Sequence, residues 1–591
     1  MTNQDALVER HAPQAGLDLY RSDNQAADLV DYNAYDTDAA LREAVHRHGA
    51  DWAEASLREQ GAHTGSAAVI RWGFLANTNK PVLKPFDRRG NRVDLVEYDE
   101  SYHRLMASAL ERRTHSEPWV DDRPGAHVAR AARSYLNVQV DAGHDCPVIM
   151  THSVVPAIKY APGLAAQWLP KINNNRYDQR NVPWFDKDAV TIGMGMTEKQ
   201  GGSDVRSNIT WARPLGARGP EQAYELFGHK WFTSAPMCDA FLILARTEKD
   251  LSCFLVPRWR PDGSKNPIEL QRLKEKLGNV SNASSELVLR GAMGWLVGEE
   301  DRGISTIMHM VALTRLGCMV EGVAGQRQAI VQAAHHCKWR SVFGKRLIEQ
   351  PLMRNVLADL QLELEGSLAI TMRMAKALDG VFAARPDEHE QQLARLGLAV
   401  GKYWVTKRTP SVTYEALECL GGNGTIEEFI SARLYRDAPI NAIWEGSGNV
   451  QALDIKRAIV KDARALDAWF AEMEAVQGAD GSLDRLIREI KKDVGVGAYD
   501  DYVARQVIEK MALAMQSSLL LQTGRPEIGE LFITSRLDRR GIGNFGNLPP
   551  HPAVDVLLER ADASTRAALE YAPQQAMPLA GSLAGAAARP G

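Results

Sequence analysis

The spacing of apolar residues changes twice along this chain of 591 residues. Up to about residue 188, apolar residues recur every three or four positions, as they do in amphipathic helices. Between 189 and 300 they form short runs separated by turn residues, as in strands. From about 301 the helical spacing returns in longer stretches. The sequence therefore predicts a multidomain α+β protein in which a β unit follows one set of helices and precedes another.

The predicted domains follow from these changes. We expect an N-terminal helical domain at 1–188, a central antiparallel sheet or barrel at 189–300, a helical bundle at 301–460, a C-terminal helical extension at 461–577 and a disordered tail at 578–591. The patterns indicate helices at 38–47, 51–60, 100–113, 126–142, 304–338, 352–378, 388–412, 449–476, 483–492, 504–521 and 553–568. They indicate strands at 223–227, 240–245, 252–256, 268–273 and 285–289.

Composition limits the class of protein. The net charge of −4 excludes a polycation of the kind that binds nucleic acid with its whole surface. Six cysteines without a CxxC pair favour free thiols in a reducing compartment. Neighbouring residues on a helix point to different faces, so His335, His336 and Cys337 do not predict a metal site. Because the N-terminus lacks a basic and then apolar leader, and no long apolar run is present, we expect a cytoplasmic protein without a membrane span.

The stretch 195–207, Gly-Met-Thr-Glu-Lys-Gln-Gly-Gly-Ser-Asp-Val-Arg-Ser, follows a short apolar run that predicts a strand. Gly201 and Gly202 lack the Cβ atoms that would keep a ligand away from the backbone. Thr197 and Ser203 offer hydroxyls that both donate and accept hydrogen bonds. The pattern is typical of a cofactor cradle, although an ordinary Gly-Gly turn with solvated polar residues has the same composition.

This string resembles the first signature of the acyl-CoA dehydrogenase flavoproteins, and four other strings extend the resemblance over roughly residues 100–460. These are 228–234 (Gly-His-Lys-Trp-Phe-Thr-Ser), 340–350, 418–425 and 443–450. The resemblance implies the family's fold and one FAD per subunit. The residues it assigns to FAD are Met196, Thr197, Gly202, Ser203, Trp231, Phe232, Thr233, Arg340, Phe343, Gln350, Gly421, Gly422, Trp444, Ser447 and Asn449.

Two of the matched strings, 340–350 and 418–425, differ from the others in what the resemblance implies. The family's counterparts of Arg340, Phe343 and Gln350 contact FAD that is bound by a neighbouring subunit. In the string 418–425 this sequence has Glu418 where the family usually has Gln, and Thr425 where it usually has Tyr. The side-chain contacts at these two positions therefore do not transfer, and the glycines carry the assignment.

The resemblance makes Glu445 the base that removes a proton α to a thioester carbonyl. A carboxylate next to Trp444 would be partly desolvated, which raises its pKa and makes it a better base. Without the resemblance, the favoured interpretation of Glu445 is a surface acid just before a helix, where the helix dipole stabilises negative charge. Some relatives carry their base at the position of Thr314, whose hydroxyl cannot act as a base near neutral pH. The resemblance assigns the next residue, Arg315, to the acyl-CoA substrate.

The residues of these motifs are most similar to the AidB-like branch of the family, and so is the length of the chain. Two further strings share this similarity, 276–279 (Lys-Leu-Gly-Asn) and 281–284 (Ser-Asn-Ala-Ser). That branch implies weak acyl-CoA dehydrogenase activity, binding of duplex DNA through the C-terminal extension, a role in the response to DNA alkylation, and homotetramers. The alternative is a purely metabolic dehydrogenase of short or branched acyl-CoA with no DNA role.

The extension, from residue 456 to the end, has 17 basic and 18 acidic residues, so a uniformly basic DNA-binding domain is excluded. Local stripes of positive charge remain. Helical spacing would place Arg457, Lys461 and Arg464 on one face, which makes them the predicted DNA contacts. A second group with similar spacing is Arg485, Arg488 and Lys492, and a third cluster is Arg536, Arg539 and Arg540. Each group is also compatible with an ordinary solvated helix face.

Overall fold

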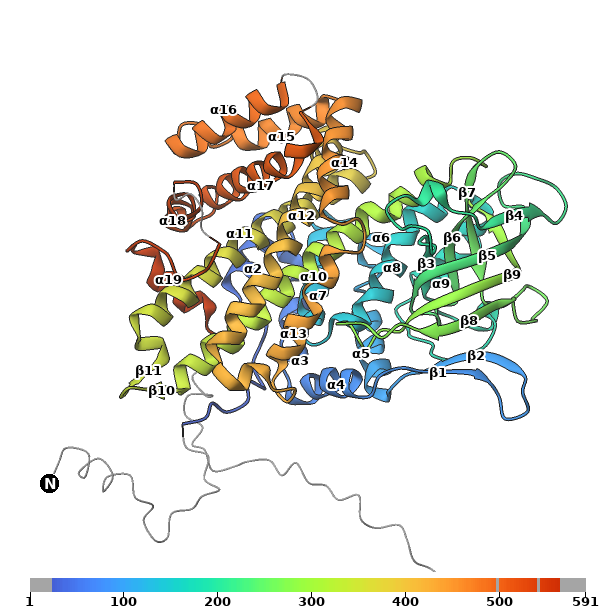
Figure 1. Cartoon of the computed structure of the whole chain (residues 1–591), viewed down its shortest axis with the longest axis horizontal. Helices are drawn as coiled ribbons and strands as arrows, with labels where there is room; N and C mark the ends of the chain where they lie inside the picture. Colours follow the sequence, from blue (N-terminus) through green and yellow to red (C-terminus); the bar gives the residue numbers. More distant parts are fainter. Residues whose placement is uncertain (1–23, 496–498, 539–542, 564–591) are drawn as a thin grey trace, which may run out of the picture.

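The computed structural model describes residues 24–495, 499–538 and 543–563. Figure 1 shows a sheet domain on the right, a helical bundle in the middle and further helices above it. This arrangement confirms the predicted fold class, in which a β unit lies between helical parts and a helical extension follows. The predicted disordered tail, 578–591, lies outside the described residues.

The N-terminal part is mainly helical, with one hairpin that the sequence analysis does not predict. Its helices are α2 (Ala39–Arg47), α3 (Glu54–Thr64), α4 (Ala67–Thr78), α5 (Glu100–Glu111), α6 (Glu117–Val120), α7 (Ala126–Val138), α8 (Ala142–Ile158) and α9 (Pro162–Ile172). The hairpin pairs β1 (Val82–Phe86) with β2 (Arg92–Glu97) and reaches under the sheet domain (Figure 1). Arg92 ties it there by donating to the Leu270 carbonyl at 2.7 Å. Charged residues interrupt both strands, which hides the apolar alternation on which strand prediction depends.

The sheet domain contains β3 (Ile192–Gly195), β4 (Trp211–Pro214), β5 (Ala223–Ser234), β6 (Ala240–Arg246), β7 (Leu251–Pro257), β8 (Ile268–Leu273) and β9 (Ser284–Leu296). Strands β6, β4, β5, β9 and β7 pair in that order, and β7 pairs again with β6, so the sheet closes into a barrel. The predicted all-antiparallel pairing is wrong at two places, because β3 and β4 each meet β6 in parallel. The intervening chain, from the end of β3 to the start of β6, is long enough for the crossover that a parallel pair requires.

The bundle is built on three long helices, α10 (Gly303–Trp339), α11 (Pro351–Phe382) and α12 (Glu388–Cys419). The sequence predicts all three, but the predicted end of the third, at 412, is seven residues too early. The short helix α13 (Ile430–Asp437) and the turn that carries Glu445 follow them. Among the described helices, α10 alone is long and apolar enough to span a membrane, but 72% of its most apolar window is buried inside the protein. It is therefore a core helix.

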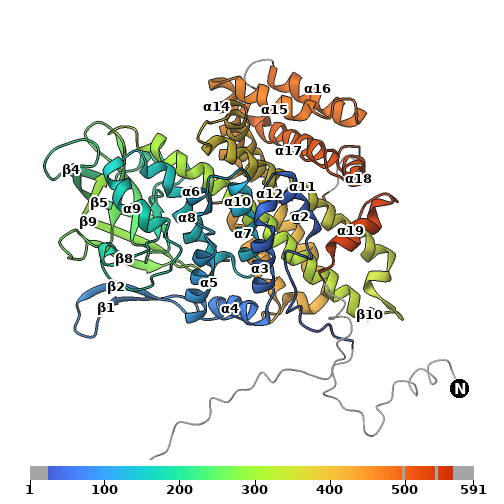
Figure 2. The same cartoon turned by 180° about the vertical axis from the view of Figure 1, so that it is seen from behind.

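The extension stacks α14 (Gly448–Lys461), α15 (Arg464–Glu474), α16 (Gly481–Gly495), α17 (Ala504–Leu521) and α18 (Pro526–Arg536) on the bundle (Figure 2). The single helix predicted at 449–476 is wrong, because Asp462 adopts an extended conformation (φ −152°, ψ 104°) and ends α14. The last helix, α19 (Ala553–Ala561), lies against α11. Trp469 of α15 has no exposed surface and anchors the extension in the common core.

Replacement of Trp469 by alanine should therefore loosen the extension. Emptying a fully buried tryptophan site typically costs about 3–5 kcal/mol of unfolding free energy. Urea unfolding followed by circular dichroism would measure the loss. Phe470→Ala is the matched control. The ring of Phe470, next to Trp469 in the chain, is only partly buried, so its removal should lower the free energy of unfolding clearly less. Equal stability of the wild type and Trp469→Ala would show that the extension does not depend on this contact.

Candidate active site

A buried ion pair fixes the base of the predicted cradle. Lys230 on β5 binds Glu198 at 2.7 Å, and neither side chain has exposed surface. Glu198 also accepts hydrogen bonds from the backbone amides of Ile209 (2.8 Å) and Thr210 (3.2 Å). Burial alone would raise the pKa of Glu198, but the Lys230 charge and these hydrogen bonds lower it to about 2. The two ends of the turn are thus pinned together below the residues that face outward.

The outward face of the turn carries the predicted cofactor residues. Met196 and Thr197 are half-buried, whereas Gly202 and Ser203 are exposed. The Thr197 carbonyl accepts a hydrogen bond from the Trp231 amide at 2.8 Å, which joins the turn to β5. A Cβ atom at position 202 would lie 3.0 Å from the Thr197 hydroxyl oxygen, so glycine keeps this surface open.

Strand β5 adds two aromatic rings and a hydroxyl to the same surface. Trp231 is half-buried, with the Lys274 ammonium 3.3 Å from its ring centre. Phe232 is 47% exposed. The buried Thr233 hydroxyl has no hydrogen-bond partner among the described residues. A buried polar group normally has a partner, and the ring nitrogens and carbonyls of a flavin could provide one. The residues on this face therefore fit FAD.

Glu445 lies in a strained turn between the bundle and the sheet domain. Its φ of +57° is left-handed, a conformation that costs a non-glycine residue free energy and clusters at functional sites. Lys402 of α12 holds the turn by donating to the carbonyls of Trp444 (2.8 Å) and Gly446 (2.5 Å). Gln451 adds hydrogen bonds of 2.9 Å to the carbonyls of Glu445 and Gly446. The surrounding helices thus impose the direction of the Glu445 side chain.

The carboxylate of Glu445 accepts a hydrogen bond from the Thr314 hydroxyl at 2.7 Å. Burial raises the pKa of Glu445 above its ordinary value. The Thr314 hydrogen bond and the charges of Lys402 and Arg315 oppose this rise without cancelling it. A carboxylate with a raised pKa is a stronger base than an exposed one. Thr314, dismissed above as a base, here positions the base.

Arg315, the predicted substrate contact, is engaged within the protein. Its guanidinium binds Asp454 of α14 at 2.7 Å, and its side chain is 8% exposed. Arg395 binds the same carboxylate at 2.8 Å. One guanidinium nitrogen, Nε, remains buried without a partner among the described residues. A direct contact of Arg315 with substrate remains a prediction.

The other predicted FAD residues fall into a near group and a far group. Near the sheet, Trp444 packs against the sheet-domain core, Ser447 precedes α14 and Asn449 is exposed. The far group follows α10 and α12, on the hairpin of β10 (Ser341–Val342) and β11 (Lys345–Arg346) and on the turn after Cys419. Its members are Arg340, Phe343, Gln350, Gly421 and Gly422.

The far group forms one cluster at the opposite end of the bundle from the sheet domain (Figures 1 and 2). Asn24 contacts both Arg340 and Ser341, and the adjacent Gln25 accepts from Asn423, so the hairpin and the glycine turn lie together. Phe343 is 96% exposed. One chain therefore does not bring the near and far groups around the same FAD.

Three residues of this site were missed in the sequence analysis. Glu198 and Lys230 stand within motifs that we used, but their pairing across 32 positions leaves no signal in one sequence. Lys402 had a signal: it is a charged residue in the apolar stretch Leu396-Gly-Leu-Ala-Val-Gly-Lys-Tyr-Trp-Val405, where a buried lysine needs polar partners.

The predicted DNA contacts do not lie on one helical face. Arg457 and Lys461 are exposed on α14 and form no ion pair with any described residue. Arg464 begins the next helix and binds Glu388 (2.5 Å) and Asp462 (2.6 Å), so it is neutralised locally. The single stripe is wrong because the chain turns at Asp462.

The second basic group is exposed, whereas the described member of the third is buried. Arg485, Arg488 and Lys492 are exposed together on α16, where only Arg485 has an acidic neighbour within the described chain, Asp538 at 3.6 Å. Arg536 is instead buried against Asp359 (2.5 Å) and Glu363 (3.4 Å) of α11. Its two companions, Arg539 and Arg540, lie outside the described residues. The exposed cations of these groups that form no ion pair with a described residue are therefore Arg488 and Lys492 on α16 and Arg457 and Lys461 on α14.

Three family models match the chain in succession. Residues 24–179 match the N-terminal domain of the adaptive response protein AidB, residues 193–292 the middle domain of acyl-CoA dehydrogenases and residues 301–460 their C-terminal domain. The putative acyl-CoA dehydrogenase AidB of Escherichia coli (strain K12) is 41% identical over 520 residues, which are 88% of this chain and 94% of that protein.

Solved structures show the same fold. The structure of Caenorhabditis elegans ACDH-11 in complex with C11-CoA has a TM-score of 0.77 at 24% identity, and the match covers 94% of each chain. A Bacillus anthracis acyl-CoA dehydrogenase solved with FAD has a TM-score of 0.59 at 15% identity, covering 80% of this chain and 87% of that one.

Replacement of Lys230 by methionine should destabilise the sheet domain and the cradle together. The change leaves Glu198 buried without its counter-ion, which typically costs about 3–5 kcal/mol. Thermal unfolding and the FAD content of the purified protein would measure the two effects. The double variant Glu198→Gln/Lys230→Met should recover much of the stability, and Lys199→Met, at an exposed neighbour, is the control. A stable, FAD-saturated Lys230→Met protein would contradict the assignment.

Proposed function

Because this chain belongs to the AidB branch of the acyl-CoA dehydrogenase family and is an FAD-dependent oxidoreductase, we propose that it oxidises an acyl-CoA thioester with Glu445 as the general base. The observation that carries this proposal is the geometry at Glu445. The Glu445 carboxylate is partly desolvated and lies beside the sheet domain. Its orientation is fixed by the strained turn, by the two hydrogen bonds that Lys402 donates to this turn and by the Thr314 hydroxyl.

In this proposal Glu445 removes a proton from the carbon α to the thioester carbonyl, and the bonding pair left behind becomes part of the new α,β double bond. Bound FAD supplies the hydride acceptor, a chemistry that the side chains lack. Met196, Thr197, Trp231, Phe232 and Thr233 would hold it on the sheet domain. Thr314 keeps the Glu445 carboxylate in one orientation between turnovers.

Two variants test the role of Glu445. Glu445→Gln should lower kcat by about 10²- to 10⁴-fold, the usual contribution of a general base. Thr314→Val removes a hydrogen bond that lowers the pKa of Glu445, so that pKa should rise further. Since only the ionised carboxylate is a base, the acid limb of the kcat/KM profile should move to higher pH.

The readout is bleaching of the flavin absorbance by a panel of acyl-CoA thioesters across a range of pH. Thr314→Ser keeps the hydroxyl and should keep the wild-type profile. Unchanged turnover in Glu445→Gln would rule out this residue as the base, and an unshifted profile in Thr314→Val would remove Thr314 from the site.

We also propose a homotetramer in the cytoplasm, in which the far group of one subunit completes the FAD site of another. The separation of the near and far groups within one chain, and the nearly full exposure of Phe343, support this. Light scattering of the FAD-loaded protein tests it, because a monomer that retains FAD would contradict a shared site.

A second function, binding of duplex DNA in the alkylation response, rests on a separate observation. We infer it from the match to AidB together with the exposed cations of α16 and α14. Arg488, Lys492, Arg457 and Lys461 have no acidic partner among the described residues, so they are free to bind phosphate. The alternative is a purely metabolic dehydrogenase, for which these residues are a solvated surface.

Salt dependence of DNA binding separates these readings. Each lost phosphate contact should lower the slope of log affinity against log salt by about 0.9, so Arg485→Ala/Arg488→Ala/Lys492→Ala should lower it by about 2.7 per subunit bound. Arg457→Ala/Lys461→Ala should have a smaller effect of the same kind, and Arg464→Ala almost none. Lys491→Ala, on α16 but paired with Glu474, is the control. Mobility shifts measure all four, and absence of a shift at low salt would leave the metabolic reading.

A further inference from the structure

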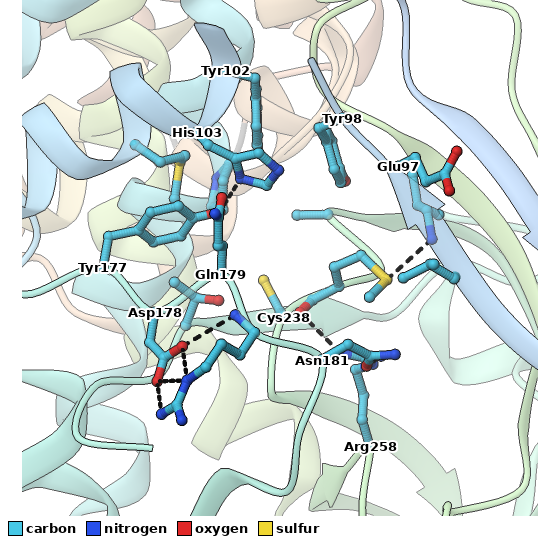
Figure 3. Close-up of a pocket in the computed structure, with 18 of the residues that line it drawn as sticks. Glu97, Tyr98, Tyr102, His103, Tyr177, Asp178, Gln179, Asn181, Cys238 and Arg258 are labelled. Atoms are coloured by element: carbon cyan, nitrogen blue, oxygen red, sulfur yellow. Dashed lines mark hydrogen bonds and ion pairs between the residues drawn. The ribbon is translucent and has the colours of Figure 1, made fainter. Parts of the chain in front are cut away.

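A cavity of about 240 Å³ lies between the N-terminal helices and the sheet domain, and none of its lining residues is among those assigned above to FAD or substrate. Its walls come from the end of β2, helix α5, the segment 177–181 and the turn between β5 and β6 (Figure 3). A cavity of about 150 Å³ is enough to hold a benzene ring. This space is therefore large enough for a small aromatic molecule.

Arg258, just after β7, gives the cavity a positive charge that forms no ion pair with a described residue, although the charges of Asp239 and Asp94 act on it from a greater distance. It is 7% exposed and donates to the Met237 carbonyl (3.2 Å) and to Asn181 Oδ1 (2.6 Å), but no described carboxylate lies within ion-pair distance. The other two cations of the wall are paired, Lys187 with Asp239 (2.8 Å) and Arg180 with Asp178 (2.5 Å). A buried charge without a counter-ion is costly unless a ligand completes it.

Aromatic rings form the opposite wall. Tyr98 and Tyr102 stack with ring centres 4.3 Å apart, and His103 Nδ1 lies 2.9 Å from the Tyr177 hydroxyl oxygen. Figure 3 shows the Tyr98 ring and Cys238 directed toward the middle of the cavity, with Arg258 beside Asn181 at the far end. The hydroxyls of Tyr98 and Tyr102 make no hydrogen bond within the described chain, so they can donate to a ligand.

We propose that this cavity is a second ligand site, which binds a small aromatic monocarboxylate. The Arg258 guanidinium pairs with the carboxylate, since a planar fork of N–H donors matches two carboxylate oxygens. The tyrosine wall packs against the ring of the ligand. One unbalanced positive charge beside an apolar, aromatic space favours a monoanion over a dianion or a neutral molecule. This site is independent of the acyl-CoA reaction.

Isothermal titration of the full-length, FAD-loaded protein with phenylacetate tests the proposal. We expect saturable binding of one phenylacetate per chain, weakened about 10- to 100-fold by Arg258→Gln, the range that loss of a charged hydrogen bond implies. Arg180→Gln is the matched control, because Arg180 is on the same wall but is exposed and paired with Asp178. The affinity of this variant for phenylacetate should equal that of the wild type.

Two further measurements do not depend on the folding of Arg258→Gln. Phenylacetamide, a neutral molecule of the same shape, should bind wild type at least tenfold more weakly than phenylacetate. Saturating acyl-CoA should leave phenylacetate affinity unchanged if the sites are separate. The proposal is overturned by lack of saturable phenylacetate binding, by equal affinity for the amide, by full affinity in a folded Arg258→Gln protein, or by displacement with acyl-CoA, which would place the molecule in the active site.

Discussion

The buried ammonium of Lys402 is the contact on which the geometry at Glu445 depends. Lys402 is only 1% exposed, and its ammonium donates hydrogen bonds to the carbonyls of Trp444 and Gly446 instead of pairing with a carboxylate. Those two carbonyls flank Glu445, so the same contact maintains a left-handed backbone that a glutamate would not adopt unaided. It also places a positive charge near the carboxylate, which limits how far burial can raise its pKa. Position and basicity of the candidate base thus have a common origin in helix α12.

The surface predicted to bind FAD depends on a second buried lysine, Lys230, which is paired with a carboxylate. Glu198 and Lys230 neutralise each other beneath the turn, so neither of these two charges faces outward beside Thr197, Gly202 and Ser203. A flavin ring needs directional hydrogen bonds and flat apolar contact more than it needs charge. The ion pair therefore acts as a rigid support rather than as a binding group.

Patterns that repeat along the chain predicted most of the fold, whereas contacts between distant residues were not predictable. The helical period identified α10, α11 and α12, and turn residues separated β5 through β9, because these signals are local. The break at Asp462 was missed, since one residue in an extended conformation does not disturb the apolar period on either side. Family motifs located Glu445, but its partners Thr314 and Lys402 are 131 and 43 positions away, and no local pattern links them.

Buried acids on two sides of α11 bind cations of the last helices of the extension. Asp359 and Glu363, one helical turn apart on α11, bind Arg536 of α18, and Glu363 also binds Arg408 of α12. Glu365, on another side of α11, binds Arg560 of α19. Arg560 reaches on to Glu43 of α2 at 2.8 Å, which connects the last described helix to the first. A chain shortened at the end of the dehydrogenase core would therefore leave Asp359 and Glu365 without these cations, whereas Glu363 would keep Arg408. In this chain the dehydrogenase core and the extension share these ion pairs, so an exchange of either part with a shorter dehydrogenase would have to replace both partners of each pair at once.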